Sequence, residues 1–214
     1  MDLEYGQRYE DFRIEVRDFL EKHKPKEGST DFSGTRRKKL MEWLSLQIEH
    51  GYWARTIPKE YGGYGAEPDL LETVIMDEEF NRAGISRGMS SQGPSMLVPT
   101  LLEHGTEEQK KKWIAPTMRS EVMWCQGYSE PGSGSDLASL QTAAREDGDD
   151  FLINGQKIWT STADRSEMIF ILVRTEPDAA KQAGISYILL PMDTPGIEVQ
   201  PSLLYTSPSP RHRG

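Results

Sequence analysis

Apolar positions in the first part of the chain recur at steps of three and four residues, the spacing of one buried face of an α-helix. The stripe over residues 5–23 consists of Tyr9, Phe12, Val16, Phe19 and Leu20. The same spacing predicts further helices over residues 36–52, 69–83, 95–104 and 106–118. These helices make the first part of the chain an all-α region.

Capping residues mark the ends of several of these helices. Asp69 stands where an N-cap belongs, and Thr106 lies three residues before Gln109, the spacing of a capping box. Gly51 closes the second helix as a C-cap glycine. Residues 58–65 carry a proline and three glycines and interrupt the helical pattern with a loop.

Beyond residue 120 the pattern changes to short apolar runs of strand length. They predict strands over residues 122–128, 140–145, 151–153, 156–160, 168–174, 185–190 and 197–200. Asp147-Gly148 and Asn154-Gly155 are typical hairpin turns. With no helical pattern between the strands, an antiparallel barrel or sandwich is expected. We therefore expect an α+β chain, with a helical domain over residues 1 to about 120 and a β domain over residues 121–201.

Composition narrows the class of protein. The 214 residues include 34 acidic and 25 basic side chains, a formal net charge of −9, which argues against nucleic acid as a partner. No apolar run approaches the ~18 residues of a membrane span. The acidic first residues do not resemble a secretory signal, and Cys125 is the single cysteine. Both observations favour a reducing cytoplasm.

Three features carry candidate chemistry, and the residues alone leave two interpretations open for each. Residues 130–136 (EPGSGSD) form either an ordinary tight loop or a donor-rich loop that contacts a ligand, and Leu137 excludes a dinucleotide fingerprint. Trp159 is either a core residue or a stacking surface for a cofactor. Cys125 is either a buried small hydrophobe or a nucleophile. The four scattered histidines predict no metal site.

Four motifs, in order along the chain, resemble the acyl-CoA dehydrogenase family. Residues 124–138 (WCQGYSEPGSGSDLA) are similar to its flavin-binding signature, and residues 154–161 (NGQKIWTS) to its second signature. Residues 58–63 (PKEYGG) and 104–110 (HGTEEQK) resemble its helical domain. The resemblance covers roughly residues 5–201.

The resemblance implies a fold and a reaction. Family members have a helical N-terminal domain, a middle β-barrel and a C-terminal four-helix bundle. They bind FAD and oxidise the Cα–Cβ bond of an acyl-CoA thioester, and an electron-transfer flavoprotein takes up the electrons. A homo- or hetero-oligomer of the full-length protein is also implied. Acyl-CoA oxidases and flavin monooxygenases of the same fold, or a non-catalytic fragment, stay open as alternatives.

The motif matches assign roles to particular residues. Gln126, Tyr128 and Ser129 match the segment that contacts the flavin ring. Trp159 and Ser161 match the pair that packs beside the ring and bonds near its N5 edge. Ser135 matches the serine that touches the acyl-CoA.

The family's catalytic base lies in the C-terminal bundle, so the resemblance assigns no catalytic residue within these 214 residues. The match ends near Pro201, and residues 202–214 resemble nothing in the family. We expect that tail to be non-native or disordered, the barrel to be incomplete, and this stretch of chain to be inactive on its own.

Overall fold

The computed structural model describes residues 6–25 and 34–200 and divides the chain into two compact units, Met1–Val122 and Met123–Gly214. We call them the helical unit and the β unit. The expectations for residues 202–214 lie outside the described residues.

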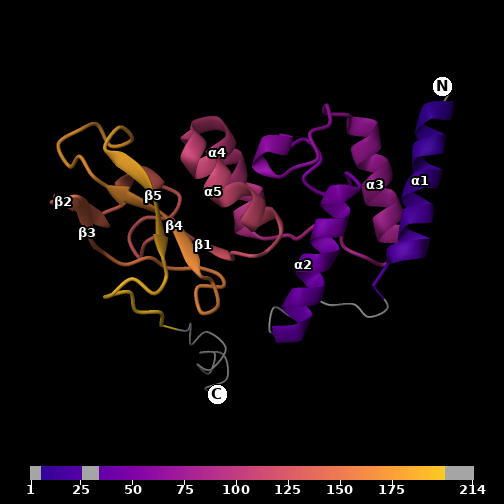
Figure 1. Cartoon of the computed structure of the whole chain (residues 1–214). Coiled ribbons are helices and arrows are strands. Elements are labelled where there is room, and N and C mark those ends of the chain that lie inside the picture. Colours follow the sequence, from indigo (N-terminus) through magenta and orange to yellow (C-terminus); the bar gives the residue numbers. More distant parts are fainter. Residues whose placement is uncertain (1–5, 26–33, 201–214) are drawn as a thin grey trace, which may run out of the picture. The chain divides into compact units, whose positions relative to one another are not determined.

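Helices make up the regular structure of the helical unit (Figure 1). They are α1 (Gln7–His23), α2 (Gly34–Glu49), α3 (Leu70–Arg82), α4 (Val98–His104) and α5 (Glu107–Met118). A 3₁₀ turn covers Lys59–Tyr61, and a π-helical turn, Gly93–Leu97, leads into α4. The helical pattern of the sequence is therefore confirmed, except that the predicted helix over residues 95–104 begins as a π-turn.

The predicted caps are present. The Asp69 carboxylate accepts the backbone N–H groups of Leu71 and Glu72 at 3.0 and 3.1 Å. Thr106 and Gln109 form the reciprocal capping box of α5. Each cap satisfies N–H groups that the first turn of a helix leaves without a partner.

The periodic stripe of α1 faces α3. Val16, Phe19 and Leu20 pack with Tyr52, Met76 and Phe80 in one cluster of buried side chains. Figure 1 shows these two helices side by side. Burying such apolar side chains is the main favourable term in folding.

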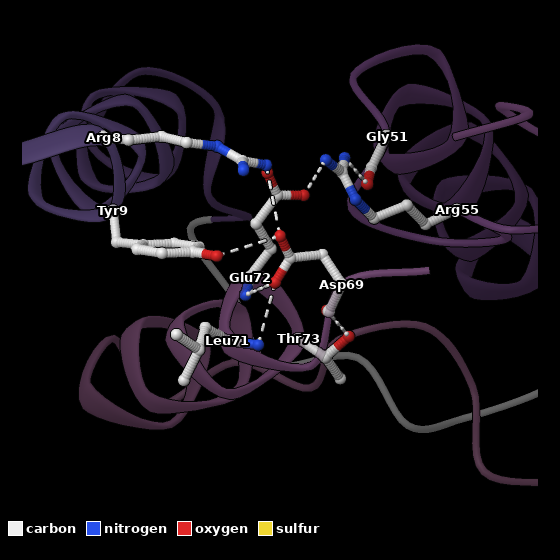
Figure 2. A network of polar contacts seen from close by, with 8 residues as sticks. All are labelled: Arg8, Tyr9, Gly51, Arg55, Asp69, Leu71, Glu72 and Thr73. Atoms are coloured by element: carbon white, nitrogen blue, oxygen red, sulfur yellow. Dashed lines mark hydrogen bonds and ion pairs between the residues drawn. The ribbon is translucent and has the colours of Figure 1, made fainter. Parts of the chain in front are cut away.

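Charged side chains pair with one another at one end of this helix pair (Figure 2). Glu72 is buried and accepts from Arg8 at 2.9 Å and from Arg55. Arg8 and the Tyr9 hydroxyl both donate to Asp69, at 3.1 and 3.2 Å. Ion pairs and hydrogen bonds therefore tie α1 and the segment that carries Arg55 to the start of α3.

The described residues of the β unit form a five-stranded mixed sheet. Its strands are β1 (Trp124–Gly127), β2 (Ala143–Asp147), β3 (Asp150–Asn154), β4 (Met168–Arg174) and β5 (Ile185–Pro191). Strand β4 is central: it pairs antiparallel with β5 on one edge and parallel with β1 and β2 on the other. The expected antiparallel barrel is therefore wrong in its strand directions: among the described residues β4 pairs parallel with β1 and β2, so the sheet is mixed.

One predicted hairpin forms and the other does not. Asp147 pairs with Asp150 across a two-residue turn in which Gly148 has φ +66°. Gly155 instead begins a stretch without regular structure, and residues 156–160 and 197–200 are not strands. A Cβ on Gly155 would meet the Thr142 backbone at 2.6 Å. Close approach, not a turn, therefore requires this glycine.

One buried cluster of the β unit gathers apolar side chains from β1, β2 and β4. Cys125, Ala144, Ile169, Ile171 and Val173 are buried together. The Cys125 Sγ lies 3.6 Å from the Met168 carbonyl oxygen, and burial raises the pKa of the thiol to about 11. This supports the interpretation of Cys125 as a small hydrophobe, because a thiol of that pKa is protonated at neutral pH.

Candidate functional site

The two signature segments of the β unit meet directly. The backbone N–H of Ile158 donates to the carbonyl of Ser129 at 2.9 Å. The Lys157 ammonium donates to the carbonyl of Tyr128 at 3.1 Å. The structure therefore brings Tyr128 and Ser129 beside the segment that carries Trp159 and Ser161.

Strand β1 supplies the first part of the candidate site. Gln126 lies on β1, and Tyr128 follows Gly127, the last residue of the strand. The Tyr128 ring is half-buried and meets the Phe170 ring edge-on, with centroids 5.9 Å apart. Burial raises the pKa of the Tyr128 phenol, and hydrogen bonds with the Tyr187 and Gln126 side chains partly offset that effect.

Trp159 is the most unusual residue of the candidate site. Its side chain is 69% exposed, so the interpretation as a core residue is wrong. Its φ is +59°, a left-handed backbone conformation that is unfavourable for a bulky residue. Strain of this kind concentrates at functional sites. Ser161 is exposed as well, and its backbone N–H donates to the Trp159 carbonyl at 2.9 Å.

The loop of residues 130–136 folds onto itself. Glu130 and Ser133 exchange backbone hydrogen bonds, and the buried Ser133 hydroxyl donates to the Asp136 carbonyl at 2.8 Å. Ser135 is exposed. The tight-loop interpretation therefore describes the backbone, and Ser135 is still free to contact a ligand. No interaction in the structure joins Ser135 to the other predicted site residues within residues 6–25 and 34–200.

Sequence reasoning missed Glu130 and Lys157, which connect the two segments. The Lys157 Nζ lies 2.8 Å from the Glu130 Oε1, and each side chain is 8% exposed. Glu130 also accepts the backbone N–H groups of Gln141 and Thr142, at 2.6 and 2.9 Å. Burial alone would raise the pKa of Glu130, but these donors outweigh it and lower the pKa to about 2. The separation of 27 positions in the sequence conceals the pair.

One polar atom near Trp159 lacks a partner. The Thr160 hydroxyl oxygen is buried and has no hydrogen-bond partner among residues 6–25 and 34–200. A buried polar group without a partner is unusual in a folded protein. The hydroxyl is therefore available to a group that the structure does not contain.

The β unit also contains an open cavity of about 1100 Å³, lined by residues that include Leu140, Arg145, Arg174 and Lys181. None of the six predicted site residues lines it. The Arg174 guanidinium is already used, because it donates to the carbonyls of Ala138, Leu140 and Lys181. The part of the chain that the structure describes holds no group of three or more His, Cys, Asp or Glu suited to a metal ion.

The two motifs of the helical unit contact each other. The Tyr61 hydroxyl of the first donates to the Glu107 carboxylate of the second at 2.8 Å. A Cβ on Gly62 would lie 2.6 Å from the Ala115 Cβ. These motifs therefore serve packing and helix capping.

Family models match almost the whole chain. The model of the acyl-CoA dehydrogenase N-terminal domain matches residues 7–121, and that of the acyl-CoA dehydrogenase middle domain matches residues 125–207. The chain belongs to the acyl-CoA dehydrogenase family. Members of this family are oxidoreductases that use FAD.

Named relatives agree with this assignment. Acyl-CoA dehydrogenase IpdE1 of Mycobacterium tuberculosis is 43% identical over 149 residues, which are 70% of this chain and 38% of the relative. The mitochondrial short-chain specific acyl-CoA dehydrogenase of Bos taurus is 36% identical over 150 residues, 70% of this chain and 36% of that protein. A solved structure, Tcur3481-Tcur3483 steroid ACAD, is 36% identical with a TM-score of 0.69 and covers 92% of this chain and 50% of its own.

The chain spans less than two fifths of the length of these two curated relatives. No helix in the described ranges is long and apolar enough to cross a membrane.

Proposed function

We propose that the protein is an FAD-dependent acyl-CoA dehydrogenase that removes hydrogen from the Cα–Cβ bond of an acyl-CoA thioester. The observation that carries the proposal is the meeting of the two signature segments, Ser129 with Ile158, next to the exposed and strained Trp159. An electron-transfer flavoprotein as electron acceptor, assembly into an oligomer and a cytoplasmic location belong to the same proposal.

The residues present fit a flavin. Trp159 offers a flat aromatic surface outside the core, which suits stacking on a planar ring. The orphaned Thr160 hydroxyl and the exposed Ser161 offer hydrogen-bonding groups beside it. Bound FAD supplies the acceptor for the hydride that leaves the β carbon. Gln126 on β1, together with Tyr128 and Ser129 just after it, would orient the ring, and Ser161 would offer a hydrogen bond to it.

The acyl-CoA thioester is held by the loop of residues 130–136. Ser135 contacts the substrate there, on an exposed loop that the Ser133 hydroxyl braces internally. The base that removes the α proton belongs, by the family resemblance, to a C-terminal helical bundle. We therefore propose that residues 1–214 alone bind the flavin weakly and do not turn over acyl-CoA.

The experiment is an FAD titration of the purified 214-residue chain, followed by flavin fluorescence anisotropy. Saturable binding is expected, and it should weaken strongly in Trp159→Ala. The same titration is repeated with riboflavin in place of FAD. A dye-reduction assay with acyl-CoA is run on the same chain. The absence of saturable binding, or equal binding by Trp159→Ala, would contradict the site. Sustained dye reduction would place a catalytic base within these residues.

A further inference from the structure

A buried lysine lies two residues before Trp159. The Lys157 and Glu130 side chains are each 8% exposed, with Nζ and Oε1 2.8 Å apart. Lysine is almost never buried unless it is paired, because removing its charge from water is unfavourable. In the β unit the other lysine with an ion-pair partner is Lys181, whose side chain is 65% exposed. Lys157 is therefore enclosed by the protein, whereas Lys181 is exposed to solvent.

The bonds of this pair converge on the candidate site. Lys157 donates to both the Glu130 carboxylate and the Tyr128 carbonyl, at 2.8 and 3.1 Å. The next residue, Ile158, donates its backbone N–H to the Ser129 carbonyl. The backbone N–H groups of Gln141 and Thr142 hold the Glu130 carboxylate in turn. A continuous set of bonds thus runs from Gln141 through the ion pair to the residue before Trp159.

Trp159 needs such a constraint. Its φ of +59° is unfavourable for a tryptophan and persists only where the surroundings impose it. Its ring is 69% exposed, so packing of the ring does not impose it. The backbone bonds after it, Ser161 to Trp159 and Ala163 to Thr160, are local turns. The tertiary contacts that precede Trp159 are those of Lys157 and Ile158.

We propose that Lys157 and Glu130 are positioning residues whose ion pair fixes Trp159 beside the end of β1. The consequence for FAD rests on the function proposed above: removing the pair leaves the stacking surface present but misplaced. Misplacement of a binding group by about an ångström lowers the effect of that group by on the order of a hundredfold in catalysis. For FAD affinity of the Lys157→Met chain we expect a loss of on the order of tenfold or more.

The test reads Trp159 without any flavin. The 214-residue chain is labelled with 5-fluorotryptophan, and its five tryptophans give separate ¹⁹F resonances, with Trp159 assigned through Trp159→Phe. In Lys157→Met the Trp159 resonance should shift and broaden while the other four keep their positions. Lys157→Arg, which keeps charge and donors, should restore it. Lys181→Met is the matched control, because it removes the exposed ion pair with Asp136 and should leave Trp159 unchanged.

An unchanged Trp159 resonance in a folded Lys157→Met chain would overturn the proposal. If that chain unfolds, the Trp159 resonance is measured in Glu130→Gln instead, and an unchanged resonance there would overturn the proposal. The amide oxygen of this variant still accepts backbone N–H groups. Loss of all five resonances in both variants would also overturn it, because the pair would then stabilise the whole unit. Failure of the parent chain to bind FAD would reject the proposed function and leave the ¹⁹F result standing.

Discussion

The two units use their family motifs for different purposes. In the helical unit, motif residues satisfy one another: Tyr61 donates to Glu107, and Thr106 and Gln109 cap α5. In the β unit, the motif leaves Trp159 exposed in a strained conformation and the Thr160 hydroxyl without a partner among the described residues. A motif whose hydrogen-bonding groups find their partners within the motifs themselves is one that builds the fold. Strain and unfilled bonding capacity mark one that is shaped for a ligand.

The largest expected effect is a steric one in the helical unit. The position of a Cβ on Gly63 overlaps the Ile57 carbonyl oxygen, which is backbone and cannot rotate away. Gly63→Ala should therefore lower the free energy of unfolding by about 3 kcal/mol. Far-UV circular dichroism in a urea titration measures this.

Gly84→Ala is the matched control. Gly84 has φ +70° and open space where a Cβ would lie, so it should show only conformational strain of about 1 kcal/mol. Equal losses for the two variants would contradict the steric argument.

Acid should affect both units by similar amounts. In the helical unit, three arginines donate to the Glu79 carboxylate. Burial alone would raise the pKa of Glu79, but the arginines outweigh it and lower the pKa from 4.5 to about 2. In the β unit, the pKa of Glu130 is lowered to the same value. A depressed folded-state pKa stabilises above pH 4.5, and that stability is lost as the pH falls toward about 2. Each group contributes about 3 kcal/mol.

Urea unfolding between pH 5 and about pH 2 measures this dependence. Glu79→Gln should flatten it for the helical unit, and Glu130→Gln for the β unit. A pH dependence that survives both substitutions would assign acid unfolding to other carboxylates.

Ser161→Ala tests the ligand side of the comparison. Removal of one hydrogen-bonding group should weaken FAD binding by about 1–3 kcal/mol. Thermal stability should not change, because Ser161 is exposed. Isothermal titration measures the affinity, and Ser135→Ala, on the loop that we propose holds the substrate, should bind FAD as the parent chain does. Equal affinity of all three chains would remove Ser161 from the site.

The smallest expected change in stability is that of Trp159→Gly. Glycine adopts φ +59° without strain, and the exposed ring contributes little burial. The free energy of unfolding should stay the same or rise by up to about 1 kcal/mol, while FAD binding is lost. Differential scanning calorimetry measures the first quantity. A clear destabilisation would show that the ring supports the fold.

The accuracy of the sequence-based predictions depends on how local each feature is. The cap at Asp69 and the box from Thr106 to Gln109 involve residues two or three apart, so the sequence alone is sufficient. The β4 and β5 runs were found because each is continuous and apolar. The parallel pairing of β1 with β4 was missed, because 44 positions (168 − 124) separate the two strands and nothing in either run specifies a parallel partner.

The same contrast between local and long-range features holds for the candidate site. The residue assignments came from motif resemblance and not from periodicity, which gave residues 156–160 as a strand. The structure instead places a positive φ at Trp159 and a buried cation at Lys157. Alternation of residue types does not encode a single left-handed residue, and an ion pair 27 residues apart leaves no local signal.

The central place of β4 has a consequence for the order of events during synthesis. Helices of the helical unit bury residues that the ribosome has already released, so this unit can fold while the rest is still being made. Strand β1 leaves the ribosome before the strand with which it pairs, because β4 begins only at Met168. Until β4 has been synthesised, Trp124 and Cys125 therefore lack the strand against which they pair. The nascent β unit therefore passes through an interval in which the edges of β1 are unpaired and its apolar side chains are exposed, the kind of surface that promotes aggregation.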